Sequence, residues 1–141
     1  MQLTRFNLII PTRYLLLLGH LVILVVLFID KEKVLENSLG LHYTPLEYST
    51  QNNLCLSTFS IAFLFVLTEL VMFLLGGTIF LYKYSVFNSL MHFSSILLTS
   101  YFIMKKWTIY SFILITIFTT TISFIAEIIT FSIKMTTRQN F

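Results

Sequence analysis

Four ionisable residues lie inside long apolar stretches of the sequence, where charged groups are costly and commonly have a function. They are His20, Glu69, His92 and Glu127. Two carboxylates and two imidazoles can form a structural hydrogen-bond network, ligate a metal, hold a haem iron between the histidines, or relay a proton or ion. These residue types leave all four possibilities open, and a network that fixes helix packing is the simplest of them.

The positions of these four residues indicate a common depth in the membrane. Each lies seven residues along the chain from a polar residue or glycine on the side of the termini. Seven residues of helix span ~10 Å. We therefore predict that the four side chains share one layer, about a third of the way in from the side that holds both termini. The four reference residues are Arg13 for His20, Gly76 for Glu69, Ser85 for His92 and Lys134 for Glu127.

Further polar and small residues recur at helical spacing along these stretches. Residues at i, i+4, i+7 and i+11 share one face of a helix. Faces of small and polar residues let membrane helices approach and hydrogen-bond, so we expect these faces to converge inside a bundle. The polar faces comprise Asn88, His92, Ser95 and Thr99, and Thr116, Thr120, Ser123 and Glu127; Thr58, Ala62, Glu69 and Gly76 form a small-residue face.

The apolar stretches themselves cover residues 11–29, 54–80, 86–104 and 108–133. Each has about the 20 residues that a helix needs to cross ~30 Å of hydrocarbon. Hydrophobic residues make up 57% of the 141-residue chain and charged residues 11%, so little of it suits a water-soluble surface. The stretches do not alternate as barrel strands do, and a backbone in lipid must satisfy its own hydrogen bonds. We predict an all-α membrane protein, a single antiparallel bundle of four transmembrane helices over residues 1–141.

Short connections at residues 81–85 and 105–107 make neighbouring helices antiparallel, and an even number of spans places both termini on one side. That side has five basic residues, against four on the other. This margin favours cytoplasmic termini by the positive-inside rule. The two sets are Arg5, Arg13, Lys83, Lys134 and Arg138, and Lys31, Lys33, Lys105 and Lys106.

The loop at residues 30–53 contains the start of a helix. Thr44 and Glu47 have the spacing of a capping box, and Pro45 occupies the first helical position. Tyr43 and Tyr48 stand where a hydrophobic staple would place them. The segment is either a structural helix start or a partner-binding epitope, and the two roles are compatible.

Motifs of soluble enzymes are absent from the sequence, including a P-loop, G-x-S-x-G and H-E-x-x-H. Cys55 is the single cysteine, so an internal disulfide is impossible. The net charge of +3 comes from scattered basic residues, which does not indicate nucleic-acid binding. We expect no enzyme activity and no cofactor; an intramembrane enzyme that modifies lipid would lack a recognisable nucleophile arrangement.

Several segments together carry a family resemblance. The segments 10–14, 18–22 and 43–48 resemble the opening and loop motif of the transmembrane protein 107 family. The resemblance covers nearly the whole chain, and it departs where Lys105-Lys106 replaces an acidic-basic pair. Further matching positions are Thr68, Glu69, Leu70, His92, Trp107, Ala126 and Glu127.

The resemblance implies a non-enzymatic scaffold subunit of the ciliary transition zone, at the base of the cilium. That family supports cilium assembly and the barrier that controls ciliary membrane composition. Its implied partners, besides the lipid bilayer, are tectonic-type, meckelin-type and B9-domain proteins of the Meckel-syndrome (MKS) module. We expect residues 44–48 and the helix faces around His20 and Glu127 to serve assembly. The alternative is a small haem- or ion-handling membrane protein that uses the four intramembrane residues.

Overall fold

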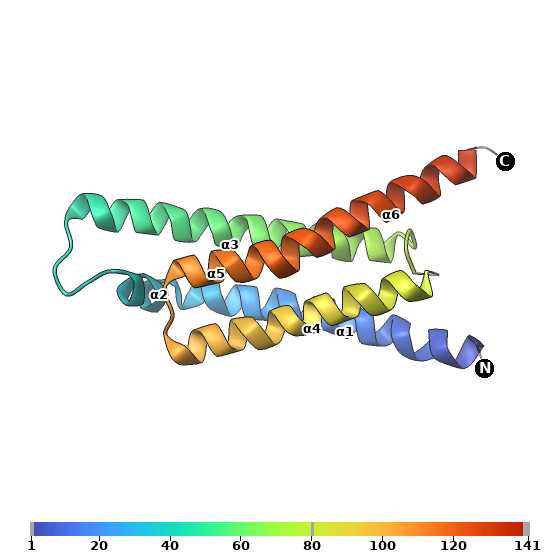
Figure 1. Ribbon diagram of the computed structural model, residues 1–141, viewed down its shortest axis with the longest axis horizontal. Helices are drawn as coiled ribbons and strands as arrows, with labels where there is room; N and C mark the ends of the chain where they lie inside the picture. Colours follow the sequence, from blue (N-terminus) through green and yellow to red (C-terminus); the bar gives the residue numbers. More distant parts are fainter. Residues whose placement is uncertain (1, 80, 140–141) are drawn as a thin grey trace.

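The computed structural model describes residues 2–79 and 81–139 as an assembly of long helices (Figure 1). The first three long helices are α1 (Gln2–Ile29), α3 (Pro45–Leu74) and α4 (Tyr82–Lys105). A short helix, α2 (Lys31–Ser38), lies between α1 and α3 in the sequence. The last long helix comprises α5 (Ile109–Thr116), a π-helical turn (Ile117–Thr121) and α6 (Ile122–Gln139). Four helices are long and apolar enough to cross a membrane, and the two chain ends lie at the same end of the bundle. The predicted all-α bundle of four spans is confirmed.

The half of the bundle nearer the loop has an apolar core. Phe59 lies edge-on to Phe112, with ring centroids 5.1 Å apart, and Phe28 packs against Phe59 at 5.7 Å. Leu24 and Phe102 are buried beside them. Large apolar side chains also cover the outside of all four long helices, as they do in membrane proteins that face lipid.

The helices extend beyond most of the predicted spans. α1 begins at Gln2, so Pro11 lies inside the helix and not at its start. α4 begins at Tyr82, one turn before the predicted residue 86, and α6 continues to Gln139, beyond residue 133. The helices are longer than the apolar stretches because their backbone hydrogen bonding continues through the polar residues at the membrane surface.

The predicted second span, residues 54–80, is displaced towards the N-terminus. α3 ends at Leu74, and Gly76 follows with a φ of 77°, a left-handed conformation that commonly terminates helices. Gly76 therefore leaves the predicted small-residue face, and the connection to α4 occupies residues 75–81 in place of 81–85. Phe80, the predicted end of this span, lies outside the described residues.

The start of α3 agrees with the capping-box spacing. The Glu47 backbone N–H donates to Thr44 Oγ1 at 3.2 Å, and the Thr44 N–H donates to Glu47 Oε2 at 2.7 Å. Pro45 occupies the first turn, and the Tyr43 and Tyr48 rings stack with centroids 6.1 Å apart. These local bonds fix where the chain leaves the loop.

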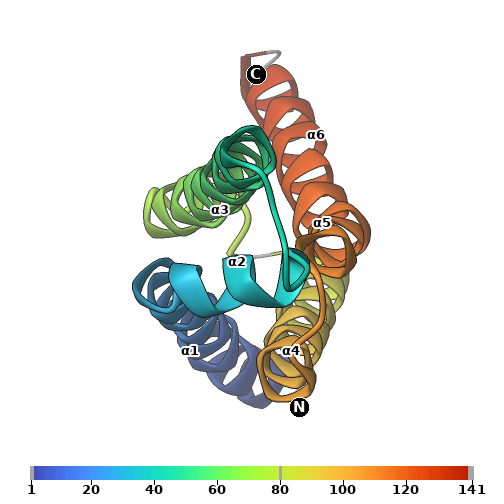
Figure 2. The ribbon, with the colours of Figure 1, turned by 90° about the vertical axis from the view of Figure 1, so that its left-hand side faces the viewer.

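α2 lies across the loop end of the bundle, as the end-on view shows (Figure 2). Val34 and Leu35 are its buried residues. Ser38 Oγ accepts a hydrogen bond from the Ile109 backbone N–H at 2.9 Å, and Lys31 Nζ donates to Asn52 Oδ1 at 2.9 Å. The sequence analysis treated this segment as loop, because eight mostly polar residues carry too weak a pattern to indicate a helix.

The fourth span is not one continuous α-helix. Residues 117–121 form a π-helical turn, where buried Thr119 donates its hydroxyl to the Ile115 carbonyl at 2.7 Å. Such turns insert one residue into a helix and change its local phase. Beyond the turn, α6 runs outward from the bundle axis (Figure 1).

Gly77 is a position where the fold depends on a missing side chain. A Cβ there would lie 2.4 Å from the Phe131 ring on α6. We predict that Gly77→Ala destabilises the protein by about 1–3 kcal/mol through overpacking. Unfolding free energies in detergent micelles measure this effect. Gly40→Ala is the control, because a Cβ at Gly40 would meet no atom within 4 Å. An equal cost of Gly77→Ala in a Phe131→Ala background would contradict the explanation.

Candidate functional site

Arg13 is fully buried in the half of the bundle nearer the termini. Its Nη2 donates to Glu127 Oε2 on α6 at 2.7 Å, and its Nη1 donates to the Thr78 hydroxyl at 3.1 Å. The guanidinium carbon lies 5.1 Å from the Phe73 ring centroid and 5.0 Å from that of Tyr84. One arginine on α1 thus contacts α3, α4, α6 and the connection between α3 and α4.

The Glu127 carboxylate is surrounded by hydrogen-bond donors. Its Oε1 accepts a hydrogen bond from the Thr78 hydroxyl at 2.7 Å, and its Oε2 accepts from Tyr84 as well as from Arg13. Both charged side chains have no solvent exposure. A buried ion pair stabilises a fold when its geometry is good and its remaining donors and acceptors are satisfied, as they are in this ion-pair cluster of Arg13, Thr78, Tyr84 and Glu127.

Asn88 joins the ion-pair cluster to a second set of polar residues. Its Oδ1 accepts from Arg13 Nε at 3.1 Å, and its Nδ2 donates to Glu69 Oε2 at 2.9 Å. Ser123 also donates to Glu69 Oε2, at 2.9 Å. An amide is suited to this position because it accepts on one side and donates on the other.

The second set is a histidine chain formed by Ser95, His20, His92 and Glu69. Ser95 Oγ is 2.9 Å from His20 Nε2, and His20 Nδ1 is 2.9 Å from His92 Nδ1. His92 Nε2 is 2.9 Å from Glu69 Oε2. These side chains are buried, and they come from α1, α3 and α4.

The atom pairs define a consistent set of proton positions with both imidazoles neutral. Ser95 donates to His20 Nε2, His20 Nδ1–H donates to His92 Nδ1, and His92 Nε2–H donates to the Glu69 carboxylate. With a second proton on His92, the direction of donation in two bonds would change. His92 Nδ1–H would donate to His20 Nδ1, and His20 Nε2–H would donate to Ser95 Oγ. Chemically, the chain can store or shift one proton within the bundle.

The structure distributes the four predicted intramembrane residues between the two groups. His20, Glu69 and His92 meet in the histidine chain, whereas Glu127 belongs to the ion-pair cluster. Both ring nitrogens of His20 are used by His92 and Ser95, so His20 pairs directly with neither carboxylate. The predicted layer thus consists of two bonded groups, which are joined through Asn88.

The two predicted polar faces do converge on the interior. Asn88, Ser95 and Thr99 are buried with His92 on α4. The corresponding residues of the fourth span are buried as well, namely Thr116, Thr120, Ser123 and Glu127.

Sequence reasoning missed Arg13, Thr78 and Tyr84 as members of the site. Arg13 follows Pro11 at the beginning of an apolar stretch, so the sequence analysis counted it among the basic residues on the side of the termini. The available signal was Glu127: a carboxylate in hydrocarbon requires a partner, and an arginine is the best suited to pair with it.

The burial of Arg13 also changes the charge argument for orientation. Arg13 is neutralised by Glu127 inside the bundle and no longer counts as a surface charge. Each side then has four basic residues. The positive-inside margin in the sequence analysis therefore disappears.

The geometry does not favour the haem, metal or ion-handling alternatives. The His20 and His92 Nδ1 atoms are 2.9 Å apart, whereas a metal between two nitrogens needs about 4 Å, from two bonds of roughly 2 Å. Towards the loop, the Thr99 hydroxyl has no hydrogen-bond partner among the described atoms, and the core beyond it is mainly apolar. The histidine chain therefore ends inside the bundle without a polar route to the loop side.

Comparisons with known proteins match most of the chain. The family model described as TMEM107, a transmembrane protein, matches residues 9–131. Transmembrane protein 107 of Rattus norvegicus is 33% identical over 103 residues, which cover 73% of this chain and 74% of the rat protein. The Homo sapiens protein of that name is 29% identical over 122 residues, 86% of this chain and 87% of its own length. No solved structure matches the chain.

The ion pair predicts strong coupling between Arg13 and Glu127. Arg13→Met and Glu127→Leu should each destabilise the protein by about 3–5 kcal/mol, because each leaves a buried charge without its partner. The double variant should cost less than the sum of the two by about 1–3 kcal/mol. Reversible unfolding in micelles or bicelles measures all three. Strictly additive costs would show that the pair does not interact as the structure places it.

Proposed function

Because the chain belongs to the transmembrane protein 107 family, we propose that it is a non-enzymatic membrane scaffold subunit of the ciliary transition zone. In this role it supports cilium assembly and the barrier that controls which membrane proteins enter the cilium. Its proposed partners are tectonic-type and meckelin-type membrane proteins and B9-domain proteins. The family match indicates no catalytic function.

The buried polar network is the observation that supports a scaffold most directly. Arg13, Glu69 and Glu127 are fully buried; Arg13 bonds directly to Glu127, and Asn88 joins Arg13 to Glu69. The network therefore holds the helices in place and presents no reactive group at a surface. The exterior consists of apolar helix faces, which suit lipid or partner helices, and of the loop end.

The burial of His20 and Glu127 limits how these two residues can serve assembly. His20 and Glu127 have 1% and 0% exposure, so their side chains are unavailable to a partner. They support assembly through the packing of this chain. Contacts with other subunits must use exposed residues.

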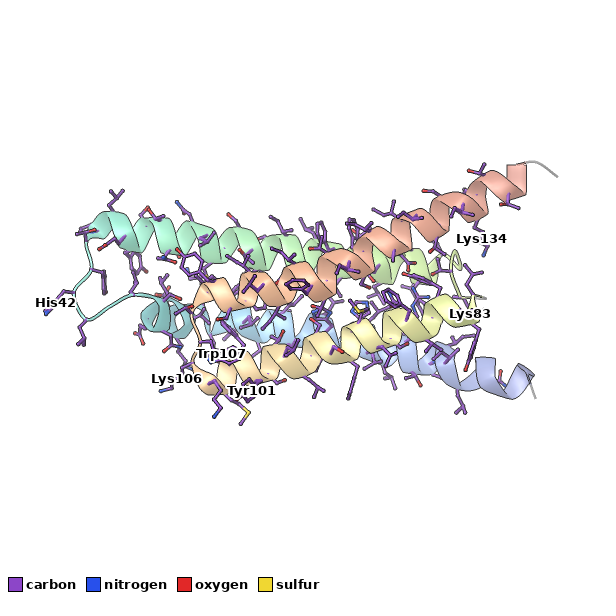
Figure 3. The ribbon with its side chains drawn as sticks, viewed as in Figure 1. His42, Lys83, Tyr101, Lys106, Trp107 and Lys134 are labelled. Carbon is purple, nitrogen blue, oxygen red and sulfur yellow. The ribbon has the colours of Figure 1, made fainter. Side chains whose placement is uncertain are left out.

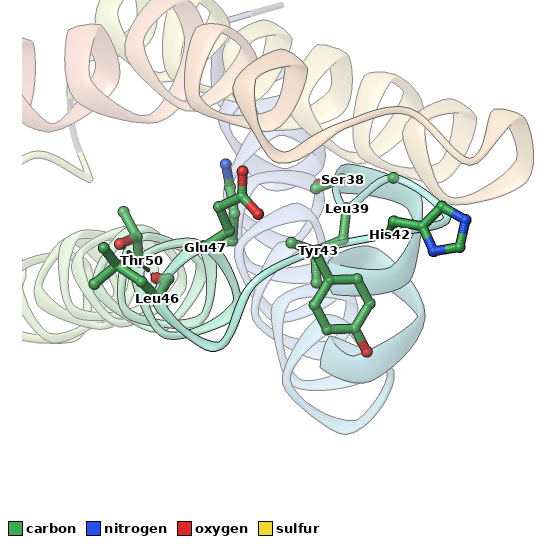
Figure 4. Close-up of a pocket in the computed structure, with 9 residues that line it drawn as sticks. Ser38, Leu39, His42, Tyr43, Leu46, Glu47 and Thr50 are labelled. Atoms are coloured by element: carbon green, nitrogen blue, oxygen red, sulfur yellow. Dashed lines mark hydrogen bonds between the residues drawn. The ribbon is translucent and has the colours of Figure 1, made fainter.

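The loop end offers an exposed apolar surface for such contacts. Leu41 is 99% exposed and Leu46 is 76% exposed. Beside them lies a pocket of about 300 Å³ between the first turns of α3 and the segment after α2 (Figure 4). The imidazole of His42 points away from α3 in this view. Exposed apolar residues around a hollow are typical of protein interaction sites, so we propose that a partner subunit binds here.

Orientation belongs to the proposal as well. Each end has four basic residues once Arg13 is neutralised, but those of the loop end are balanced by Asp30, Glu32, Glu36 and Glu47. We propose that both termini lie in the cytoplasm, where the anionic leaflet attracts the less balanced basic end, and that the loop lies on the opposite side of the membrane.

Localisation tests the proposed function directly. A small tag placed after Phe141 in a ciliated cell should give a ring between basal-body and axoneme markers. We expect this ring because the scaffold acts at the base of the cilium. A harmless tag that spreads over the reticulum, mitochondria or plasma membrane would contradict the proposal.

The loop surface gives a second expected outcome. Leu41→Ser with Leu46→Ser should lower co-purification of the partner subunits about tenfold, because exposed apolar anchors dominate such contacts. The fold should be unchanged, since neither side chain is buried. Glu36→Gln, another exposed change at the loop end, is the control. Full recovery of partners with the double serine variant would contradict a contact at the loop end and would favour one at the helix faces.

A further inference from the structure

A pocket of about 150 Å³ lies at the loop end, where α1 and α4 both finish. Residues of α1, α2 and α4 line it, together with the connection that follows α4. α1 ends at Ile29 and α4 at Lys105, and both helices are long and apolar enough to cross a membrane. The pocket therefore lies at the depth where the ends of the spans meet lipid headgroups. We call it the interface pocket.

Aromatic residues beside the interface pocket support this depth. Trp107 lines the pocket and is 40% exposed, and its ring meets the Tyr101 ring edge-on, with centroids 5.1 Å apart. Figure 3 shows both residues, with Lys106, where α4 reaches the loop end. Tryptophan and tyrosine are enriched at membrane–water interfaces, because each has an apolar ring and a polar group that can reach water.

The interface pocket has an apolar floor and a charged rim. The floor residues Leu27, Val34 and Phe102 are at most 5% exposed. Charged side chains of both signs form the rim, among them Asp30 and Lys106. The last carbonyls of α4 add partial negative charge at this end of the helix. A ligand that fits must combine an anion with a cation that carries apolar surface.

Lys106 has a backbone conformation that is unusual for a lysine. Its φ of 53° lies in the left-handed region, where glycine commonly ends a helix. A residue with a side chain is less stable than glycine in this conformation. Local strain of this kind clusters at functional positions, and here it accompanies an ammonium at the rim of a pocket.

We propose that the interface pocket binds the headgroup of a phosphatidylcholine in the leaflet on the loop side. The trimethylammonium group lies on the apolar floor and against Trp107, because a quaternary ammonium presents methyl groups and binds aromatic rings. Asp30 supplies the opposite charge, and the phosphate meets the Lys106 ammonium.

The size of the interface pocket fits a headgroup without its acyl chains. Pockets for drug-sized ligands measure ~300–1,000 Å³, and this pocket has about 150 Å³. The acyl chains therefore stay outside, along the lipid-facing surface of the helices. The site is separate from the proposed partner surface around Leu41 and Leu46 and does not depend on it.

Trp107 provides the readout, since it is the only tryptophan in the chain. The full chain in a neutral maltoside detergent is titrated with dihexanoyl phosphatidylcholine or dihexanoyl phosphatidylglycerol, and Trp107 fluorescence reports the occupancy. Phosphatidylcholine should bind about fivefold more tightly, because phosphatidylglycerol has no cation for Trp107 and Asp30. General attraction to the net charge of +3 predicts the opposite order.

Two substitutions of Lys106 test the phosphate contact. Lys106→Gln should lower the affinity for phosphatidylcholine about fivefold. Lys105→Gln is the matched control, because Lys105 is the preceding residue and does not line the pocket. Lys106→Gly separates binding from folding: it removes the ammonium and relieves the left-handed strain, so it should bind as weakly as Lys106→Gln and unfold at a higher temperature.

Three results would overturn the proposal. The first is equal or tighter binding of phosphatidylglycerol by the wild type. The second is wild-type affinity in Lys106→Gly, or an equal loss in Lys105→Gln and Lys106→Gln, which would indicate an effect of net charge. The third concerns glycerophosphocholine, which lacks acyl chains and should bind more weakly than the lipid; equal binding would assign the pocket to a water-soluble ligand.

Discussion

The rest of the structure depends on placing one arginine and one carboxylate together inside the membrane. A single charged residue at the centre of a membrane helix costs about 2.5–3.5 kcal/mol to insert. Arg13 and Glu127 avoid that state by pairing at 2.7 Å, with Thr78 and Tyr84 using the remaining carboxylate oxygen positions. Because these groups come from separate parts of the chain, the pair forms when the helices are in their final order. The ion pair therefore specifies the arrangement of the bundle.

The histidine chain extends the same constraint deeper into the bundle. Asn88 connects Arg13 to Glu69, and His92 connects Glu69 to His20, so α1, α3, α4 and α6 share one set of polar contacts. Lipid provides little force between apolar helices, so polar contacts and close packing must hold them. With most of its buried polar groups bonded to one another, the bundle can present apolar helix faces to lipid and to the proposed partners. This division is what the proposed scaffold role requires.

The sequence predicted the architecture well and the polar contacts less well. Hydrophobic length identified four spans, and helical spacing identified the faces of Asn88 and Ser123 that the structure buries. The capping box at Thr44 located the start of α3, because that signal is local. Arg13 was misplaced because its role depends on Glu127, 114 residues away. The end of α3 and the π-helical turn were missed since apolar composition does not report backbone conformation.

The central claim is that the buried charges serve packing and perform no chemistry. The measurement that tests it is the localisation of the Arg13→Met/Glu127→Leu double variant in ciliated cells, after its folding has been verified in micelles. If packing is their role, the folded double variant should still form the ring at the base of the cilium. A folded double variant that leaves this position, while the wild type keeps it, would contradict the account and assign the charges a function of their own.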